Sequence, residues 1–176
     1  MVNQCREPAP TFEISNERFY KSSELKAIGL LVVQGNFLEH QCREAIIALI
    51  DADRETGIIA ISGMNLRTMT QILKALVYQK LPAQTSRFDR LLKHIETAID
   101  YRNRTAHSTL LPQFVLGKLT ASRQRVRARK GRLSFVENEP LTVHQIKRRA
   151  LFIHRTAEAL LTFLVENEIQ QSCTAS

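Results

Sequence analysis

The sequence predicts a mainly α-helical protein, an antiparallel helical bundle with a small β-hairpin insertion before the last helix. Three observations lead to this fold class. Apolar residues recur at helical spacing over several long segments. A basic segment that precedes the last of them alternates like β-strands. The chain has 176 residues, 44% of them hydrophobic and 24% charged, which suits one self-supporting globular domain.

The first helix is predicted to open at Ser22, where serines can cap free N–H groups. Its apolar positions recur over residues 27–50, and Gly35 should weaken it locally. Residues 51–57 are predicted to form a turn-like break. Residues 58–61 could then be a short strand or the start of a buried helix, an ambiguity that periodicity leaves open.

Two further helices precede the basic segment. One is expected to start at an N-cap, either Asn65 or Thr68, and to end before Pro82. The next should run from near Ser86 to about His107, and it has the most regular apolar stripe in the chain.

Residues 112–140 are predicted to be a basic β-hairpin insertion with a turn at Lys130-Gly131. Thr142 should cap the last helix, which extends almost to residue 169. Residues 22–169 would therefore form one helical domain, preceded by a flexible N-terminal arm over residues 1–21 and followed by a frayed tail over residues 170–176.

Composition narrows the class of protein. Lys and Arg number 25 against 17 Asp and Glu, and the formal charge of +8 favours polyanionic partners such as RNA, DNA or an acidic protein. The three cysteines are widely spaced and form no disulfide or zinc pattern. No stretch approaches the length of a membrane span or a signal core. We expect no metal, no cofactor, no membrane association and a cytoplasmic location.

The most informative stretch is residues 101–108, which read YRNRTAHS. At about 100° per residue, Asn103 and His107 share one face of a helix. Arg102 falls instead on the apolar side, three positions after Ile99. Burying an unpaired guanidinium there would cost several kcal/mol, so Arg102 must meet a carboxylate, backbone carbonyls or an anionic ligand.

The pattern Arg102-Asn103-x-x-x-His107 at a helix end resembles the R-x4-H signature of HEPN domains. Leu38-Glu39 in the first helix and the segment 61–64 also agree with bacterial HEPN-like proteins of unassigned role, and the resemblance covers roughly residues 25–168. The resemblance implies a metal-independent endoribonuclease, often a toxin or defence component. In such proteins paired motifs line a cleft between two subunits.

The residues themselves suit RNA cleavage without a metal. That reaction needs a base for the 2′-OH proton and cationic donors for the phosphorane, which histidine and arginine supply near pH 7. His107 would act as base or acid, and Arg102 would hold the phosphate. Asn103 would orient either His107 or the phosphate by hydrogen bonding. Arg104, inside the same motif, is assigned to RNA binding.

The same motif also has a purely structural interpretation. Arg102 and Asn103 could brace the helix end by bonding loop carbonyls or Glu39 in the first helix. His107 would then be an ordinary residue at a helix terminus, where cations are favourable. Glu39 is therefore the candidate partner of Arg102.

The basic segment contains an alternating series of arginines. In one extended strand their side chains would project from one face about 7 Å apart, near the spacing of phosphates. The series consists of Arg123, Arg125, Arg127 and Arg129. We predict that it binds RNA, although a solvated edge strand that uses charge against aggregation would look the same.

Three functional hypotheses follow. The first is a homodimeric HEPN-type endoribonuclease that binds RNA along the arginine-bearing hairpin and has an antitoxin protein as a partner. The second is a non-catalytic HEPN-like interaction module that braces a dimer or binds an anionic partner. The third is a DNA- or RNA-binding regulator, for which binding would depend steeply on salt and no turnover would occur.

Overall fold

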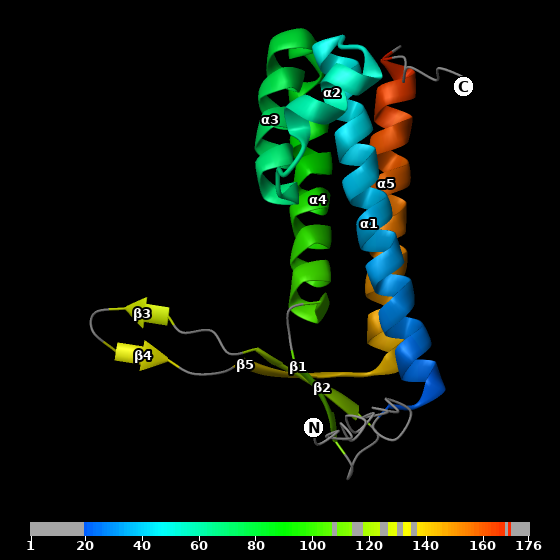
Figure 1. Ribbon diagram of the computed structural model, residues 1–176, viewed down its shortest axis with the longest axis vertical. Coiled ribbons are helices and arrows are strands. Elements are labelled where there is room, and N and C mark those ends of the chain that lie inside the picture. The colour runs from blue at the N-terminus through cyan, green and yellow to red at the C-terminus, as the bar shows by residue number, and fades with distance from the viewer. Residues whose placement is uncertain are drawn as a thin grey trace, which may run out of the picture.

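The computed structural model describes residues 20–106, 109–113, 118–123, 127–129, 132–134, 137–167 and 169. Its helices are α1 (Ser22–Ile50), α2 (Arg54–Ile61), α3 (Leu66–Lys80), the short 3₁₀ helix η2 (Pro82–Gln84), α4 (Thr85–Ala106) and α5 (Val143–Glu166). The mainly α-helical class is thereby confirmed, and the helices pack as a bundle (Figure 1). The predicted N-terminal arm, up to residue 19, and the predicted tail lie outside the described residues.

The bundle is antiparallel only in part. Helices α4 and α5 run in opposite directions, since Arg87 pairs with Glu166 near one end and Tyr101 contacts Phe152 further along. Helix α1 runs beside α5 in the same direction (Figure 1). The chain turns back through α2 before α3 begins, which is why α1 and α5 end up parallel.

Capping explains where the helices begin. Asn65 accepts a hydrogen bond from the Thr68 N–H, so Asn65 and not Thr68 is the cap of α3. Thr142 accepts one from the Gln145 N–H, which confirms the predicted cap of α5. The first helix differs from expectation. Its N-cap is Lys21 rather than a serine, and the Lys21 N–H donates to the Glu24 carboxylate at 2.7 Å. The acidic side chain at the third position of the helix therefore satisfies the N–H of the N-cap residue, and its charge suits the positive end of the helix dipole.

Helix α2 corrects the predicted break over residues 51–57. Asp51 does end α1 in a left-handed conformation, but a new helix starts at Arg54 and includes residues 58–61. Asp53 caps α2, and hydrogen bonds from Thr56 lower the pKa of the Asp53 carboxyl. A Cβ at Gly57 would lie 2.8 Å from Cγ1 of Ile47, so glycine lets α2 cross close to α1.

The core lies where α1, α3, α4 and α5 meet. Phe88 of α4 packs against Phe163 of α5 with ring centroids 5.3 Å apart. The largest fully buried side chains come from all four helices and from Leu141, just before α5: Leu31, Leu38, Ile46, Ile47, Met69, Leu73, Phe88, Ile95, Leu141, Ile146 and Phe163. Each helix therefore presents the apolar stripe that its sequence predicts. Among the described residues, no helix combines the length and apolar character that crossing a membrane requires.

Short strands connect α4 to α5. They are β1 (Thr109–Gln113), β2 (Lys118–Arg123), β3 (Arg127–Arg129), β4 (Arg132–Ser134) and β5 (Glu137–Leu141). Strands β1, β2 and β5 form an antiparallel sheet in that order, next to the end of α4 (Figure 1). Strands β3 and β4 pair separately, with Arg129 opposite Arg132, and this ribbon extends away from the helices. The single hairpin predicted over residues 112–140 is therefore not seen, because the strands divide between two separate sheets.

Candidate functional site at the end of helix α4

Arg102 lies in the last turns of α4, facing α1. A Cβ built on Gly35 of α1 would fall 2.6 Å from Cγ of Arg102, 3.5 Å from its Cβ and 3.7 Å from its Cδ. Any side chain larger than hydrogen at position 35 would therefore collide with the stem of Arg102. We call this close approach the Gly35 notch. The notch explains how a half-buried arginine fits on the apolar side of α4.

The guanidinium of Arg102 has a neutral partner. Its Nη1 donates to Oδ1 of the next residue, Asn103, at 3.2 Å. Within the part of the chain that the structure describes, no carboxylate forms an ion pair with Arg102. Its positive charge is therefore held in place without being neutralised by those residues.

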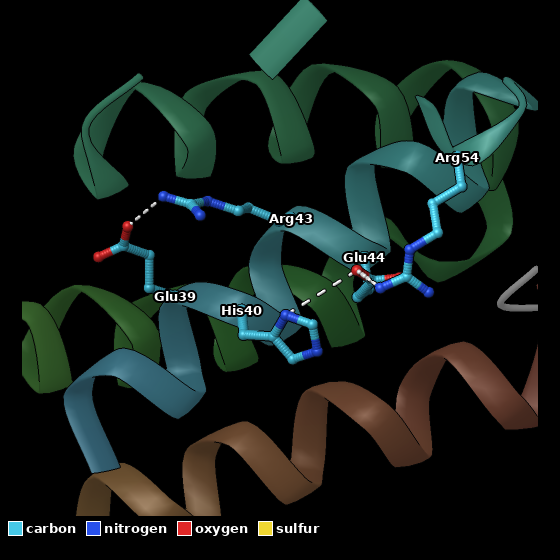
Figure 2. Close-up of polar contacts among 5 residues, drawn as sticks. All are labelled: Glu39, His40, Arg43, Glu44 and Arg54. Carbon is cyan, nitrogen blue, oxygen red and sulfur yellow. Dashed lines mark hydrogen bonds and ion pairs between the residues drawn. The ribbon is translucent and has the colours of Figure 1, made fainter. Parts of the chain in front are cut away.

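Glu39, the candidate partner of Arg102, is engaged elsewhere. Its Oε1 accepts from Nη2 of Arg43 at 2.6 Å, one turn further along α1 (Figure 2). The pairing is local, because residues four apart on a helix face the same side. Arg102 instead crosses α1 one turn earlier, at Gly35.

Asn103 also lines a pocket of about 560 Å³ between α3 and α4. The pocket wall is of mixed charge, since it includes Arg67 and Lys93 as well as the acidic Asp100. Arg104 lies near Asp100, with 3.8 Å between Nη2 and Oδ2. Of the predicted site residues, the structure thus brings Arg102 and Asn103 into direct contact and places Arg104 against an acidic neighbour.

His107 lies outside the described residues, directly after the last residue of α4, Ala106. The last turn of α4 is packed against the rest of the protein, since Thr105 is only 2% exposed. The Thr105 hydroxyl also donates a hydrogen bond to the carbonyl oxygen of Tyr101 at 3.0 Å. The base from which residue 107 extends is therefore well packed.

The arginine series does not lie on one continuous strand. Arg123 ends β2, where its register partner is Glu137 of β5, whereas Arg127 and Arg129 belong to β3. Arg125 lies outside the described residues. The expectation of one extended strand is therefore wrong, because β2 pairs with β5 and β3 pairs with β4, which separates the series into two sheets.

A second polar cluster lies between α1 and α2. The Glu44 carboxylate accepts from Nη2 of Arg54 at 3.3 Å and lies 3.8 Å from Nδ1 of His40 (Figure 2). Glu44 is 9% exposed, and the cluster borders a pocket of about 290 Å³. The Arg54 pairing connects α2 to α1 and gives the nearly buried Glu44 carboxylate a cationic partner.

Sequence reasoning missed a basic and aromatic pocket on the α5 side of the motif. Tyr101, which directly precedes Arg102, lies under the guanidinium of Arg149 and beside the ring of Phe152. A signal for it was present, because Lys147-Arg148-Arg149 forms a basic run in α5. What the sequence does not indicate is that this run faces the residue next to Arg102.

Comparison with known proteins adds no relative: no family model, no curated protein and no solved structure matches this chain.

Proposed function

We propose that this protein is a metal-independent endoribonuclease of HEPN type that acts as a toxin or defence component. One observation carries the proposal. The Gly35 notch fixes the Arg102 guanidinium beside Asn103, with no carboxylate partner among the described residues, at the helix end that leads into His107. A fixed, uncompensated guanidinium next to an amide is suited to holding a phosphate oxygen.

The proposed reaction is an intramolecular transfer within the RNA. The 2′-oxygen attacks the adjacent phosphorus while the bond from phosphorus to the 5′-oxygen breaks, which leaves a 2′,3′-cyclic phosphate and a free 5′-hydroxyl. His107 takes the 2′-OH proton or protonates the leaving 5′-oxygen. Arg102 stabilises the negative charge that builds on the phosphorane oxygens. Asn103, bonded to Arg102, keeps the guanidinium oriented.

Partners follow from the same proposal. Two motifs from a homodimer would face one RNA strand, and Arg123, Arg125, Arg127 and Arg129 would hold its backbone. The formal charge of +8 supports a polyanionic substrate. An antitoxin protein would bind the same basic end, and the protein would work in the cytoplasm without a membrane or a cofactor.

An RNA digest tests the proposal. Purified protein is incubated with mixed cellular RNA in EDTA, and fragment ends are analysed by ligation and mass spectrometry. We expect 2′,3′-cyclic phosphate ends with the wild type and none with His107→Ala. Intact RNA with both proteins, or equal cleavage by both, would contradict the proposal.

A second candidate is a non-catalytic interaction module, and the Gly35 notch favours it as well. The stem of Arg102 fills the space between α4 and α1, so the residue also braces the two helices. If this is its whole role, Arg102→Ala should destabilise the protein by a few kcal/mol while RNA remains intact with wild type and variant alike. Steeply salt-dependent RNA or DNA binding without turnover would instead indicate a nucleic-acid-binding regulator.

A further inference from the structure

A small pocket lies between α4 and the first half of α5. Its volume is about 230 Å³, below the 300–1,000 Å³ or so that is usual for drug-sized ligands, so it would hold one planar group or one phosphate with the rest of the ligand outside. Its lining consists of Tyr101, Gln145, Arg148, Arg149 and Phe152. We call it the α4–α5 pocket.

The aromatic wall of this pocket is already stacked with an arginine. Cζ of Arg149 lies 4.9 Å from the ring centroid of Tyr101. Phe152 meets the same ring edge-on, with centroids 5.6 Å apart and an interplanar angle of 75°. Guanidinium planes and aromatic rings are the surfaces on which single-stranded RNA bases stack.

The charge of the α4–α5 pocket distinguishes it from the others. Its lining contains no acidic side chain among the described residues, and the sequence has no Asp or Glu from Thr142 to Ala157. By contrast, the pocket between α3 and α4 includes Glu96 and Asp100, and the pocket between α1 and α2 includes Glu44. A phosphate is therefore best accommodated in the α4–α5 pocket.

Gln145 supplies a directional polar group. Its Oε1 accepts from both the N–H and the hydroxyl of Thr142, at 2.8 and 3.1 Å. The carbonyl end of the amide is therefore committed to the helix cap, and the NH₂ end is the one that can donate to a ligand. Exposed Arg148 adds a second cation at the rim.

We propose that the α4–α5 pocket binds one nucleotide of a single-stranded RNA, with the base stacked at Arg149 and Tyr101 and a phosphate held by Arg148. The assignment of RNA as the ligand rests on the proposed function. It extends that function by assigning a nucleotide-binding site next to the candidate catalytic residue Arg102. Tyr101 directly precedes Arg102, so a nucleotide in the pocket would anchor the strand next to the phosphate that Arg102 holds.

Binding measurements in the His107→Ala background test this without cleavage. A short fluorescent oligoadenylate is titrated in EDTA with this protein and with versions that also carry Arg149→Lys or Arg148→Gln/Arg149→Gln. Arg149→Lys keeps the charge and loses the planar stacking surface. The matched control is Lys80→Gln/Arg90→Gln, which removes two exposed cations, with Arg90 about 16 Å along α4 from Tyr101. Thermal unfolding establishes that each variant is folded.

We expect Arg149→Lys to weaken oligoadenylate binding about tenfold, the Arg148→Gln/Arg149→Gln pair to weaken it further, and the control pair to change it only a few-fold. Binding of inorganic polyphosphate should be unaffected by Arg149→Lys, because polyphosphate has no base. Competition by adenosine monophosphate should be weak, because most contacts of a strand lie outside the pocket.

The inference is overturned if the protein does not bind oligoadenylate, if it binds an acidic peptide in preference, or if the control pair weakens oligoadenylate binding as much as Arg148→Gln/Arg149→Gln does. It is also overturned if Arg149→Lys weakens polyphosphate binding as much as oligoadenylate binding. Competition by adenosine monophosphate as strong as competition by the unlabelled oligonucleotide would overturn it too. If Arg149→Lys does not fold, the exposed Arg148→Gln substitution alone decides, with Arg90→Gln as its control. The nuclease proposal fails separately. If the wild type leaves RNA uncut but RNA binding still depends on Arg149, the nuclease proposal fails and the nucleotide-binding inference stands. If RNA is cut and the rate is unchanged by Arg148→Gln/Arg149→Gln, the nucleotide-binding inference fails and the nuclease proposal stands.

Discussion

Gly35 is the residue on which the position of Arg102 depends. A glycine inside a long helix lowers helix stability, and the sequence alone predicts only that weakening. In the structure the missing side chain is the space through which the Arg102 stem crosses α1. The helix therefore carries a local cost that allows a cation to sit between two packed helices.

Substituting Gly35 or Gly29 should change the free energy of unfolding in opposite directions. Gly35→Ala should lower the free energy of unfolding by about 1–3 kcal/mol, because the new methyl group overpacks against Cγ of Arg102. Gly29→Ala, in the same helix with no atom within 4 Å of the added Cβ, should raise it by up to about 1 kcal/mol. Urea denaturation measures both.

A double-mutant cycle tests whether the effect of Gly35→Ala arises from contact with the Arg102 stem. Adding Arg102→Ala to Gly35→Ala should recover part of the loss, since the clashing stem is gone. If Gly35→Ala is as stabilising as Gly29→Ala, Arg102 does not cross α1 at the notch.

Cys42 shows how strongly the core excludes charge. It is fully buried in α1, and burial, with a smaller contribution from nearby Glu39, raises the pKa of its thiol from 9.0 to about 12. The folded state thus holds the proton to higher pH than the unfolded state. Its contribution to stability is complete below pH 9 and is lost as the pH rises toward about 12.

The thiol should behave accordingly. In a Cys5→Ser/Cys173→Ser protein, Cys42 is expected to resist alkylation at neutral pH until the protein is unfolded, because the thiolate is the reactive form. Between pH 9 and 12 the free energy of unfolding should fall less steeply in Cys42→Ala than in the wild type. Identical slopes, or rapid alkylation of the folded protein, would contradict the burial of Cys42.

Among the elements, α5 has the clearest start signal in the sequence. Thr142 and Gln145 form a capping box in which each side chain accepts from the backbone N–H of the other residue. The same glutamine lines the α4–α5 pocket, so the cap and the proposed nucleotide site share a residue.

Removing the Thr142 N-cap should lower the free energy of unfolding. Thr142→Ala is expected to lower the free energy of unfolding by about 1 kcal/mol, since one N–H of the first turn loses its acceptor. Thr162→Ala, an exposed position inside the same helix, should be neutral or slightly stabilising. Equal effects of the two substitutions in thermal or urea denaturation would exclude the capping role.

The long helices could be predicted because each has an apolar stripe over many turns, and α3 and α5 also have a side-chain N-cap. Helix α2 could not, since its eight residues make little more than two turns and begin inside a polar stretch. Its start signal, Asp53 with Thr56 three residues later, becomes decisive only once α2 packs against α1 at Gly57.

The candidate site could be predicted only as a local pattern. Helical periodicity placed Arg102 on the apolar side, and the structure has it packed against α1. The identity of its neighbours depends on which helices meet. Glu39 pairs with Arg43, Tyr101 faces Arg149, and the arginine series is divided between two sheets. The Glu39–Arg43 pair follows from its spacing of four residues in one helix. The Tyr101–Arg149 contact and the division of the arginines depend on tertiary packing, which local spacing does not give.

At the scale of the whole molecule, the basic groups of the motif gather where α4 ends and α5 begins. Arg102 and Arg104 lie in the last turns of α4, the run Lys147-Arg148-Arg149 lies in the first turns of α5, and the strands connect the two helices (Figure 1). The net charge of +8 thus includes these five cations at one end of the bundle. Such a distribution steers a polyanion toward that end.

The central claim is that the Arg102 guanidinium acts on a phosphate rather than only bracing two helices, and Arg102→Met separates the two roles. Methionine keeps an unbranched stem for the Gly35 notch and removes the charge. The measurement is the rate at which 2′,3′-cyclic phosphate ends appear in EDTA, with the free energy of unfolding recorded on the same samples. We predict that the free energy of unfolding of Arg102→Met lies within about 1 kcal/mol of the wild-type value, and that the variant no longer cleaves RNA. A folded Arg102→Met protein that cuts RNA at the wild-type rate would contradict the claim.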